Sequence, residues 1–228
     1  MTKGLKILYL HGLGSSIQNR TGLALKQLFE QKNNFERLVY TNPGSKERHW
    51  SEWLKDVENR IRGENNWILI ATSAGAGIAM KTAVRNPEKV KGLFLFCPGF
   101  DLTMSYVDSL APGAVDMLKE GKSLIHPASR NGFPALVDYV SFEEFLEMCV
   151  SNYPGKIPIT CPVTIVHGTD DETVPFEKSF KLAKQLQSEE VDVFIVEGGT
   201  HYLDIDEKVL ERVDQFVEKI ASQQKAKL

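Results

Sequence analysis

The sequence predicts an α/β fold built on a doubly wound, mostly parallel sheet of about six strands. Short apolar runs alternate with stretches of helical spacing along most of the chain. Runs such as Trp67–Ala71 are apolar at every position, which is typical of strands buried on both faces of a parallel sheet. The length of 228 residues suits one domain, so we expect a single unit over residues 1–228 with right-handed crossovers between its strands.

The expected elements follow one another in a regular order. Six apolar runs predict strands: Leu5–Leu10, Arg37–Tyr40, Trp67–Thr72, Val90–Cys97, Val163–His167 and Val191–Val196. Between or after them, apolar side chains recur at helical spacing and predict helices over Thr21–Gln31, Trp50–Ile61, Ala74–Arg85, Phe176–Gln187 and Glu207–Ala221.

One stretch, about residues 101–158, breaks this alternation, and no strand is evident in it. Within it Ser141–Val150 has helical spacing, with Ser141 and Glu144 as a capping box at its start. We expect a helical lid insert that lies over the sheet and shapes a substrate pocket. Its apolar side chains favour a hydrophobic substrate: Leu102, Met104, Tyr106, Val107, Leu110, Phe142 and Phe145.

Charge and composition exclude several classes of function. The formal net charge is −3, without the basic excess of a nucleic-acid-binding protein. The first apolar run is too short for a membrane span or a signal peptide, so we expect neither. The three cysteines, Cys97, Cys149 and Cys161, are widely spaced and predict neither a disulfide framework nor a zinc site. Core packing explains Cys97 and Cys149, and we expect no cofactor and no metal.

Ser73 is the first residue that suggests chemistry. It lies where the apolar run Trp67–Thr72 gives way to a helical pattern rich in small residues. This resembles a nucleophile elbow, the tight strand-to-helix turn that presents a serine at the edge of a sheet. Gly75 matches the second glycine of the pattern Gly-x-Ser-x-Gly, whereas Ala71 stands at the first. A serine that only caps the following helix is the alternative.

An acidic loop follows the fifth expected strand. His167-Gly168 is followed by Asp170, Asp171 and then Val174-Pro175, a recognisable form of the loop that carries the acid of a catalytic triad. This spacing selects Asp171, with Asp170 as the second choice. Either carboxylate could instead cap the next helix.

The third candidate is His201, in the sequence Glu197-Gly198-Gly199-Thr200-His201 between the last strand and the last helix. Its neighbours are polar and loop-like, so packing does not explain it. Among the five histidines it alone has this placement; we expect His11 and His167 to hold loops by hydrogen bonds, and His49 and His126 to lie on the surface or in the lid.

A glycine-rich turn, His11-Gly12-Leu13-Gly14, ends the first strand. Acyl transfer needs two backbone N–H groups directed at the developing oxyanion. We expect one from Ala74, directly after the serine, and one from Leu13. The turn lacks the glycine patterns of phosphate-binding loops. The chain order is therefore oxyanion loop, serine, aspartate, histidine, which is the order of α/β-hydrolases.

With these motifs the sequence resembles the α/β-hydrolase superfamily over nearly its whole length, and within it the abhydrolase-domain group of acyl-protein thioesterases and acyl-glucuronide hydrolases. The segments that carry the narrower resemblance, besides the acid loop, are Trp53–Val57, Asn86–Val90, Pro158–Pro162 and Val191–Val193. The resemblance implies an ester or thioester hydrolase that forms an acyl-enzyme. The chain departs from the group at the elbow and lacks its mitochondrial leader.

We therefore expect hydrolysis of a carboxylic ester or thioester on a small-molecule or acyl-protein substrate with a hydrophobic acyl group. In this hypothesis Ser73 attacks, His201 transfers the proton and Asp171 orients His201. Peptide or carbon–carbon bond hydrolysis by the same triad is one alternative, since a fold does not fix the reaction. A catalytically weak binding protein is the other.

We expect a cytoplasmic location, because no leader precedes the first strand. The chain ends in Ala226-Lys227-Leu228, a close variant of the peroxisomal address Ser-Lys-Leu. Peroxisomal import is therefore the alternative if the protein is eukaryotic.

Overall fold

A computed structural model describes residues 4–32, 34–41, 49–101, 106–108, 111–125 and 136–226 of the chain. Its main sheet has six strands in the order β2-β1-β3-β4-β7-β8, and every neighbouring pair is parallel. The strands are β1 Lys6–Leu10, β2 Phe35–Arg37, β3 Trp67–Thr72, β4 Val90–Phe96, β7 Val163–Gly168 and β8 Val191–Val196. This confirms the predicted fold class.

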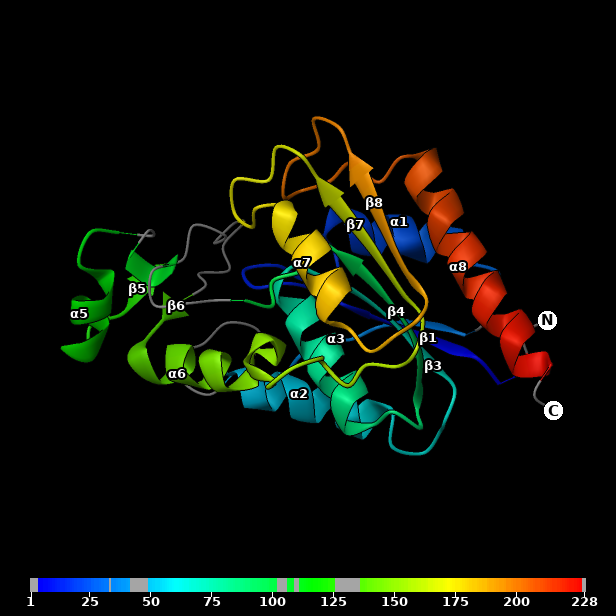
Figure 1. The fold of residues 1–228 in the computed structure, drawn as a ribbon, viewed down its shortest axis with the longest axis horizontal. Coiled ribbons are helices and arrows are strands. Elements are labelled where there is room, and N and C mark those ends of the chain that lie inside the picture. The colour runs from blue at the N-terminus through cyan, green and yellow to red at the C-terminus, as the bar shows by residue number, and fades with distance from the viewer. Residues whose placement is uncertain are drawn as a thin grey trace.

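The sheet lies between two layers of helices (Figure 1). One layer holds α1 Arg20–Leu28 and α8 Glu207–Lys225; the other holds α2 His49–Arg60, α3 Ala74–Arg85 and α7 Glu177–Gln185. Alternate side chains of β1 enter the two cores: Leu8 and Leu10 pack on the side of α2 and α3, and Ile7 and Tyr9 on the side of α1 and α8. Burial on both faces is why the central strands read as unbroken apolar runs.

The strand order reverses between β1 and β3. From β1 the chain first adds β2 on one side, then crosses back to add β3, β4, β7 and β8 on the other. The loops that leave β1 and β3 therefore separate in opposite directions and leave a crevice at the carboxyl ends of these two strands. Ser73 and the glycine-rich turn after β1 lie at this point.

The second strand begins earlier than predicted. The expected strand was Arg37–Tyr40, whereas Phe35–Arg37 pairs with Ile7–Tyr9 of β1. Leu38 still donates its backbone N–H to Tyr9, but the chain then leaves the sheet. The ring of Tyr40 stacks on Trp53 at 3.9 Å and is buried in the core beside α2. The apolar residues near Tyr40 thus result from burial against α2 and not from strand pairing.

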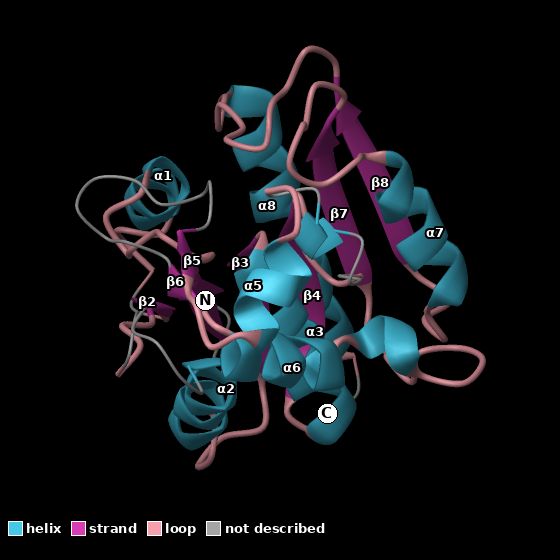
Figure 2. Cartoon of the chain, turned by 90° about the vertical axis from the view of Figure 1, so that its left-hand side faces the viewer, coloured by secondary structure: helices cyan, strands magenta, loops and turns pink. Residues whose placement is uncertain are grey.

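The insert between β4 and β7 contains α5 Ala114–Lys119, α6 Tyr139–Met148 and a short 3₁₀ helix, Val150–Asn152. It also contains an antiparallel pair of two-residue strands, β5 Leu124–Ile125 and β6 Leu136–Val137. The expectation that this stretch lacks strands was wrong, because two residues are too few to show a period of two. Figure 2 views the molecule from the side of this insert.

The capping box predicted for α6 was also wrong. Helix α6 begins two residues before Ser141, and Asp138 is its N-cap, accepting a hydrogen bond from the Ser141 backbone N–H at 2.7 Å. Glu144 instead accepts from the backbone N–H of Trp50 at 3.2 Å, so it serves the start of α2. Both Asp and Ser favour N-caps, and residue preference alone did not separate them.

The insert has a small apolar core of its own, and other residues of it, among them Phe145, Cys149 and Val150, pack in the main core. Val107, Ala114, Leu118, Leu124, Val137 and Phe142 form the small core. Phe145 packs instead in the main core, edge-on to Trp50 with ring centroids 4.5 Å apart. The predicted lid residues Leu102, Met104 and Leu110, together with His126, lie outside the described residues, as do the side chain of His49 and the end residues Lys227 and Leu228.

Candidate active site

Ser73 occupies a strained turn between β3 and α3. Its backbone has φ 50° and ψ −124°, a conformation that few residues other than glycine adopt. Three backbone hydrogen bonds hold it: Ser73 N–H donates to Phe96, and Ser73 C=O accepts from Ala76 and Gly99, all at 2.9–3.0 Å. The side chain makes no helix-capping bond although Ser73 stands at the N-cap of α3. The geometry is therefore that of a nucleophile elbow and not of a capping serine.

Close backbone contacts explain the small residues around the elbow. A Cβ on Gly75 would stand 2.5 Å from the backbone oxygen of His11 and 2.8 Å from that of Leu10. Helix α3 can approach the end of β1 only because residue 75 has no side chain. Ala71, at the first glycine position of the pattern, is fully buried among the residues of the main core. Its methyl group is thus accommodated by packing.

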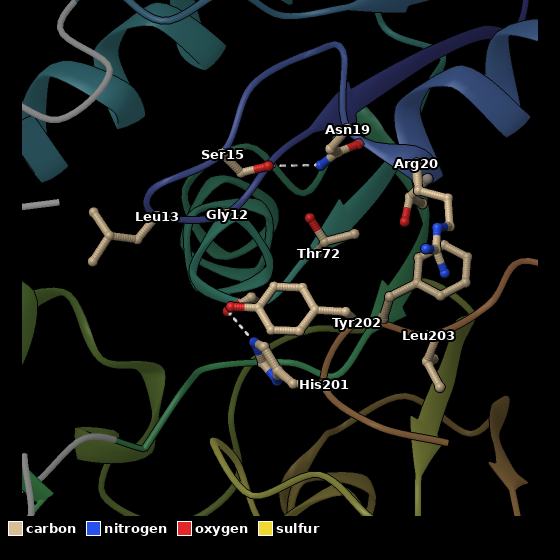
Figure 3. Close-up of a pocket in the computed structure, with 12 residues that line it drawn as sticks. Gly12, Leu13, Ser15, Asn19, Arg20, Thr72, His201, Tyr202 and Leu203 are labelled. Carbon is tan, nitrogen blue, oxygen red and sulfur yellow. Dashed lines mark hydrogen bonds between the residues drawn. The ribbon is translucent and has the colours of Figure 1, made fainter. Parts of the chain in front are cut away.

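His201 bridges the serine to the acid. Its Nε2 lies 2.9 Å from Ser73 Oγ, and its Nδ1 lies 2.7 Å from Asp171 Oδ2. His201 comes from the loop between β8 and α8, and only 6% of its side chain is exposed. Figure 3 shows the imidazole of His201 in the wall of the pocket. The three side chains thus come from loops at three strand ends and meet in one line.

Asp171 is buried and held at both oxygens. Its Oδ1 accepts from the backbone N–H groups of Thr173 and Val174 at 2.9 and 2.7 Å, and its Oδ2 contacts His201 and His167. Burial raises the pKa of this carboxyl, but the hydrogen bonds from the two histidines and the loop outweigh it and hold the pKa well below its usual range. The carboxyl is therefore ionised at neutral pH.

The second choice for the acid, Asp170, lies elsewhere. Its side chain is exposed and accepts a hydrogen bond from its neighbour Thr169 at 2.9 Å. Its backbone N–H donates to Gly199 at 2.8 Å, which ties the acid loop to the loop of His201. The two loops approach so closely that a Cβ on Gly168 would stand 2.0 Å from the backbone oxygen of Gly199. Asp171 and not Asp170 contacts the histidine.

A pocket of about 110 Å³ opens beside Ser73 and His201. Its wall includes Gly12 and Leu13 from the turn after β1, and Figure 3 shows this turn opposite His201. Ala74 follows Ser73 directly at the start of α3. The two residues expected to donate to an oxyanion therefore both lie next to the serine.

Polar side chains line much of the pocket's remaining wall. They are Ser15, Asn19, Arg20, Thr21, Thr72 and Tyr202. Asn19 is held firmly, since its amide donates to Ser15 Oγ at 2.9 Å and to the buried Tyr9 hydroxyl at 2.8 Å. The pocket thus offers hydrogen-bonding groups within a wall that also contains Leu13, Phe96 and Leu203.

Two residues near the acid were not assigned to the site from the sequence. His167 was expected only to hold a loop, yet its Nε2 lies 2.9 Å from Asp171 Oδ2. Cys97 was expected in the core, and it is buried, but it also follows β4 with φ 43° and faces Asp171. A signal was present for Cys97, because β4 lies between β3 and β7, whose carboxyl ends both carry site residues.

Cys97, Asp171 and His201 offer ligand atoms that all lie within 4.8 Å of one another. Burial, reinforced by the charge of Asp171, raises the pKa of the Cys97 thiol well above its usual value, so the thiol is neutral. The Nδ1 of His201 and Oδ2 of Asp171 are 2.7 Å apart, closer than two ligands of one zinc ion, which are roughly 3.3 Å apart in a tetrahedral site. The hydrogen bond between His201 and Asp171 therefore accounts for this cluster.

Comparisons with known proteins agree with this architecture. The family model described as the prolyl oligopeptidase family matches residues 49–223. Palmitoyl-protein thioesterase ABHD10, mitochondrial, from Rattus norvegicus is 28% identical over 208 residues, covering 86% of this chain and 68% of the relative. The Homo sapiens protein of the same name is 25% identical over 233 residues, which cover 95% of this chain and 74% of the relative.

Solved structures show the same fold. Alpha/beta hydrolase domain-containing protein 10 from mouse superposes with a TM-score of 0.80 at 23% identity, covering 96% of this chain and 90% of that one. Est1E from Butyrivibrio proteoclasticus, solved with ferulic acid, gives a TM-score of 0.70 at 18% identity, covering 97% and 91%. Because the family model matches residues 49–223, which are most of the chain, the chain belongs to the prolyl oligopeptidase family. It is a hydrolase of the α/β-hydrolase fold.

Proposed function

We propose that the protein hydrolyses carboxylic esters or thioesters with a hydrophobic acyl group, through an acyl-enzyme on Ser73. The observation that carries this proposal is the line of contacts from Ser73 Oγ through His201 to Asp171, at 2.9 and 2.7 Å, beside a strained elbow. A serine hydroxyl is a weak nucleophile until a base accepts its proton. Here the base is in contact and is itself oriented by a buried carboxylate.

In the proposed reaction, His201 Nε2 takes the proton of Ser73 as Oγ attacks the carbonyl carbon. The tetrahedral intermediate collapses and the C–O or C–S bond breaks, while His201 returns the proton to the leaving oxygen or sulfur. A water molecule then repeats the sequence on the acyl-enzyme, releasing the acid and restoring Ser73. Asp171 stays ionised throughout and stabilises the imidazolium form of His201.

The oxyanion of both tetrahedral intermediates needs donors that are already in place. We assign the backbone N–H groups of Leu13 and Ala74 to this role. Leu13 lines the pocket that holds Ser73, and Ala74 is the first residue of α3, where backbone N–H groups lack helical partners. Removing one such donor typically lowers kcat by about 10²–10³-fold.

Two observations support an acyl substrate. The relatives in the comparison are named palmitoyl-protein thioesterases, so an acyl thioester is their printed substrate class. The insert that follows β4 has an apolar core of its own. We propose that this insert acts as the lid over the acyl chain. We assign the pocket beside His201 to the leaving group, because His201 is the residue that protonates it.

A panel of esters and thioesters tests the proposal. The protein is assayed on p-nitrophenyl esters and acyl-coenzyme A thioesters of increasing chain length, with Ser73→Ala as the control and thermal melting to show that the control is folded. We expect kcat/KM to rise from acetyl toward longer chains and to vanish in Ser73→Ala. Absence of turnover on every member of the panel would count against acyl hydrolysis.

Peptide hydrolysis is the second candidate, and the match to the prolyl oligopeptidase family favours it over carbon–carbon cleavage. The same triad would attack an amide, with His201 protonating the leaving amine. Proline-containing p-nitroanilides in the same assay decide between the two. An ester hydrolase is expected to leave them intact, whereas rates above those on esters would move the assignment to a peptidase.

The compartment remains a prediction made from the sequence. The relatives are named mitochondrial, whereas the sequence favours a cytoplasmic location or, through its last three residues, a peroxisomal one. Among the residues that the structure describes, no helix is long and apolar enough to span a bilayer. Fusing the last three residues to a fluorescent protein in a eukaryotic cell tests the peroxisomal alternative, which predicts puncta that disappear when Leu228 is removed.

A further inference from the structure

His167 is the last residue but one of β7 and is completely buried. Its Nε2 lies 2.9 Å from Asp171 Oδ2 and 2.9 Å from the backbone oxygen of Val174. Its Nδ1 lies 2.6 Å from the hydroxyl of Ser179, a buried residue of α7. The imidazole therefore links the acid loop to the body of the fold through both ring nitrogens.

The partners of His167 determine where its proton lies. Asp171 is ionised and the Val174 oxygen is a carbonyl, so both neighbours of Nε2 can only accept hydrogen bonds. Nε2 must therefore carry a hydrogen and donate it. Asp171 Oδ2 thus receives one donor from His167 on the side of the core and one from His201 on the side of the substrate.

We propose that His167 is a positioning residue of the triad, which fixes Asp171 Oδ2 so that the carboxylate holds His201 in line with Ser73. This inference rests on the proposed function. The two backbone donors hold Oδ1. On Oδ2 the Nε2–H of His167 is the donor from the side of the core, and the Ser179 hydroxyl fixes the ring of His167 in turn.

Other titratable groups that face Asp171 do not account for the same effect. Cys97 and Tyr106 both lie close to its charge. Burial and the charge of Asp171 raise the pKa of both, to about 12 for Tyr106, so both are neutral in the working range of a serine hydrolase. The ring nitrogens of the two histidines, His167 Nε2 and His201 Nδ1, lie 2.9 and 2.7 Å from Asp171 Oδ2.

Two amide substitutions at position 167 separate positioning from packing. The amide nitrogen of His167→Gln falls where Nε2 stood and can still donate to Asp171. That of His167→Asn falls near the former Nδ1, so it reaches toward Ser179 and not toward Asp171. Both variants are polar and smaller than histidine, so each leaves a similar gap in the core. The donor to the acid is the feature that differs between them.

We expect His167→Gln to keep kcat within about threefold of wild type and His167→Asn to lose roughly 10–100-fold, by analogy with hydrogen-bond partners that orient the ligands of a metal site. KM should be unchanged in both, because His167 does not touch substrate. Without the hydrogen bond from residue 167, the negative charge of Asp171 stabilises the imidazolium form of His201 more strongly. The rising limb of the pH profile of kcat/KM should therefore move to higher pH in His167→Asn and stay in place in His167→Gln. Equal kcat values and equal limbs in the two variants would overturn the proposal.

A nuclear magnetic resonance measurement provides a readout that does not depend on turnover. The proton between His201 Nδ1 and Asp171 gives a downfield signal, which we expect in wild type and in His167→Gln and expect to weaken or shift upfield in His167→Asn. An unchanged signal in His167→Asn would contradict the inference even if the variant were less active. If wild type itself reacts with no acyl substrate and with no fluorophosphonate, the proposed function fails instead.

Discussion

At Ser73 the chain keeps a backbone conformation that costs of order 1–3 kcal/mol for a residue with a side chain. Three backbone hydrogen bonds to β4, α3 and the loop after β4 hold it there. In return the hydroxyl stands clear of α3 and reaches His201. The strain is thus localised at the residue that we propose as the nucleophile, and glycines on neighbouring segments make the turn sterically feasible.

Gly75 is the most constrained of these glycines. We expect Gly75→Ala to lower the free energy of unfolding by about 1–3 kcal/mol, since the new methyl would meet the backbone oxygens of Leu10 and His11 and neither can move aside. Displacing α3 from β1 should also lower kcat. Gly63→Ala is the control, because a Cβ there meets nothing within 4 Å. Urea unfolding of both variants checks this; equal stabilities would contradict the tight elbow.

The charge of Asp171 makes the free energy of unfolding depend on pH. Its pKa is lowered on folding, so the ionised form stabilises the native state above the ordinary pKa of an aspartate, about 3.9. That stabilisation is lost as the pH falls toward the folded-state value. We expect Asp171→Asn to be less stable than wild type near neutral pH, with the difference shrinking below about pH 4. Urea titrations at each pH measure it, with the exposed Asp170→Asn as the control. A difference that grows on acidification would contradict the assignment.

At the scale of elements, buried strands and long helices could be predicted because their patterns are long and repetitive. The strands β1, β3, β4, β7 and β8 match their predicted bounds within one residue. The shortest strands could not be predicted, because β2 pairs through only three residues and β5 and β6 through two each. Tyr40 shows the physical reason, since packing on Trp53 produces the same apolar signal as a strand.

The start of α6 gives a direct test of this limit. Asp138 caps the helix through the backbone N–H of Ser141. We expect Asp138→Ala to cost about 1 kcal/mol in the free energy of unfolding, the usual loss for an N-cap carboxylate. Ser141→Ala should cost less, because its hydroxyl makes only a long contact of 3.4 Å to the backbone oxygen of Asp138. Thermal melts of the two variants compare them, and the reverse order would restore the capping box expected from the sequence.

At the scale of the molecule, the order of motifs along the chain was enough to predict the meeting of Ser73, Asp171 and His201. Parallel strands bring their carboxyl ends to one edge, so loops far apart in sequence converge there. The surroundings of the acid were harder to predict. The contact of His167 with Asp171 depends on a side chain turning back beside its own loop, which no spacing rule encodes.

Phe145 is one of the residues through which the insert packs in the main core. We expect Phe145→Ala to destabilise the protein by about 3–5 kcal/mol, because its buried ring packs on Trp50 of α2. If the insert acts as the lid, KM for long acyl esters should rise more than KM for acetyl esters. Val140→Ala, on the exposed side of the same helix, is the control. A loss of stability without any dependence on acyl chain length would argue that the insert does not cover the acyl chain.

The central claim is that Ser73, activated by His201 and Asp171, is the nucleophile. The most direct measurement is labelling of the folded protein with a fluorophosphonate, which resembles the tetrahedral intermediate of acyl transfer, followed by mapping of the labelled peptide. We predict labelling on Ser73, its loss in Ser73→Ala and His201→Ala, and its retention in Cys97→Ala. Labelling that survives Ser73→Ala, or that disappears with Cys97→Ala in a folded protein, would contradict the account and place the nucleophile elsewhere.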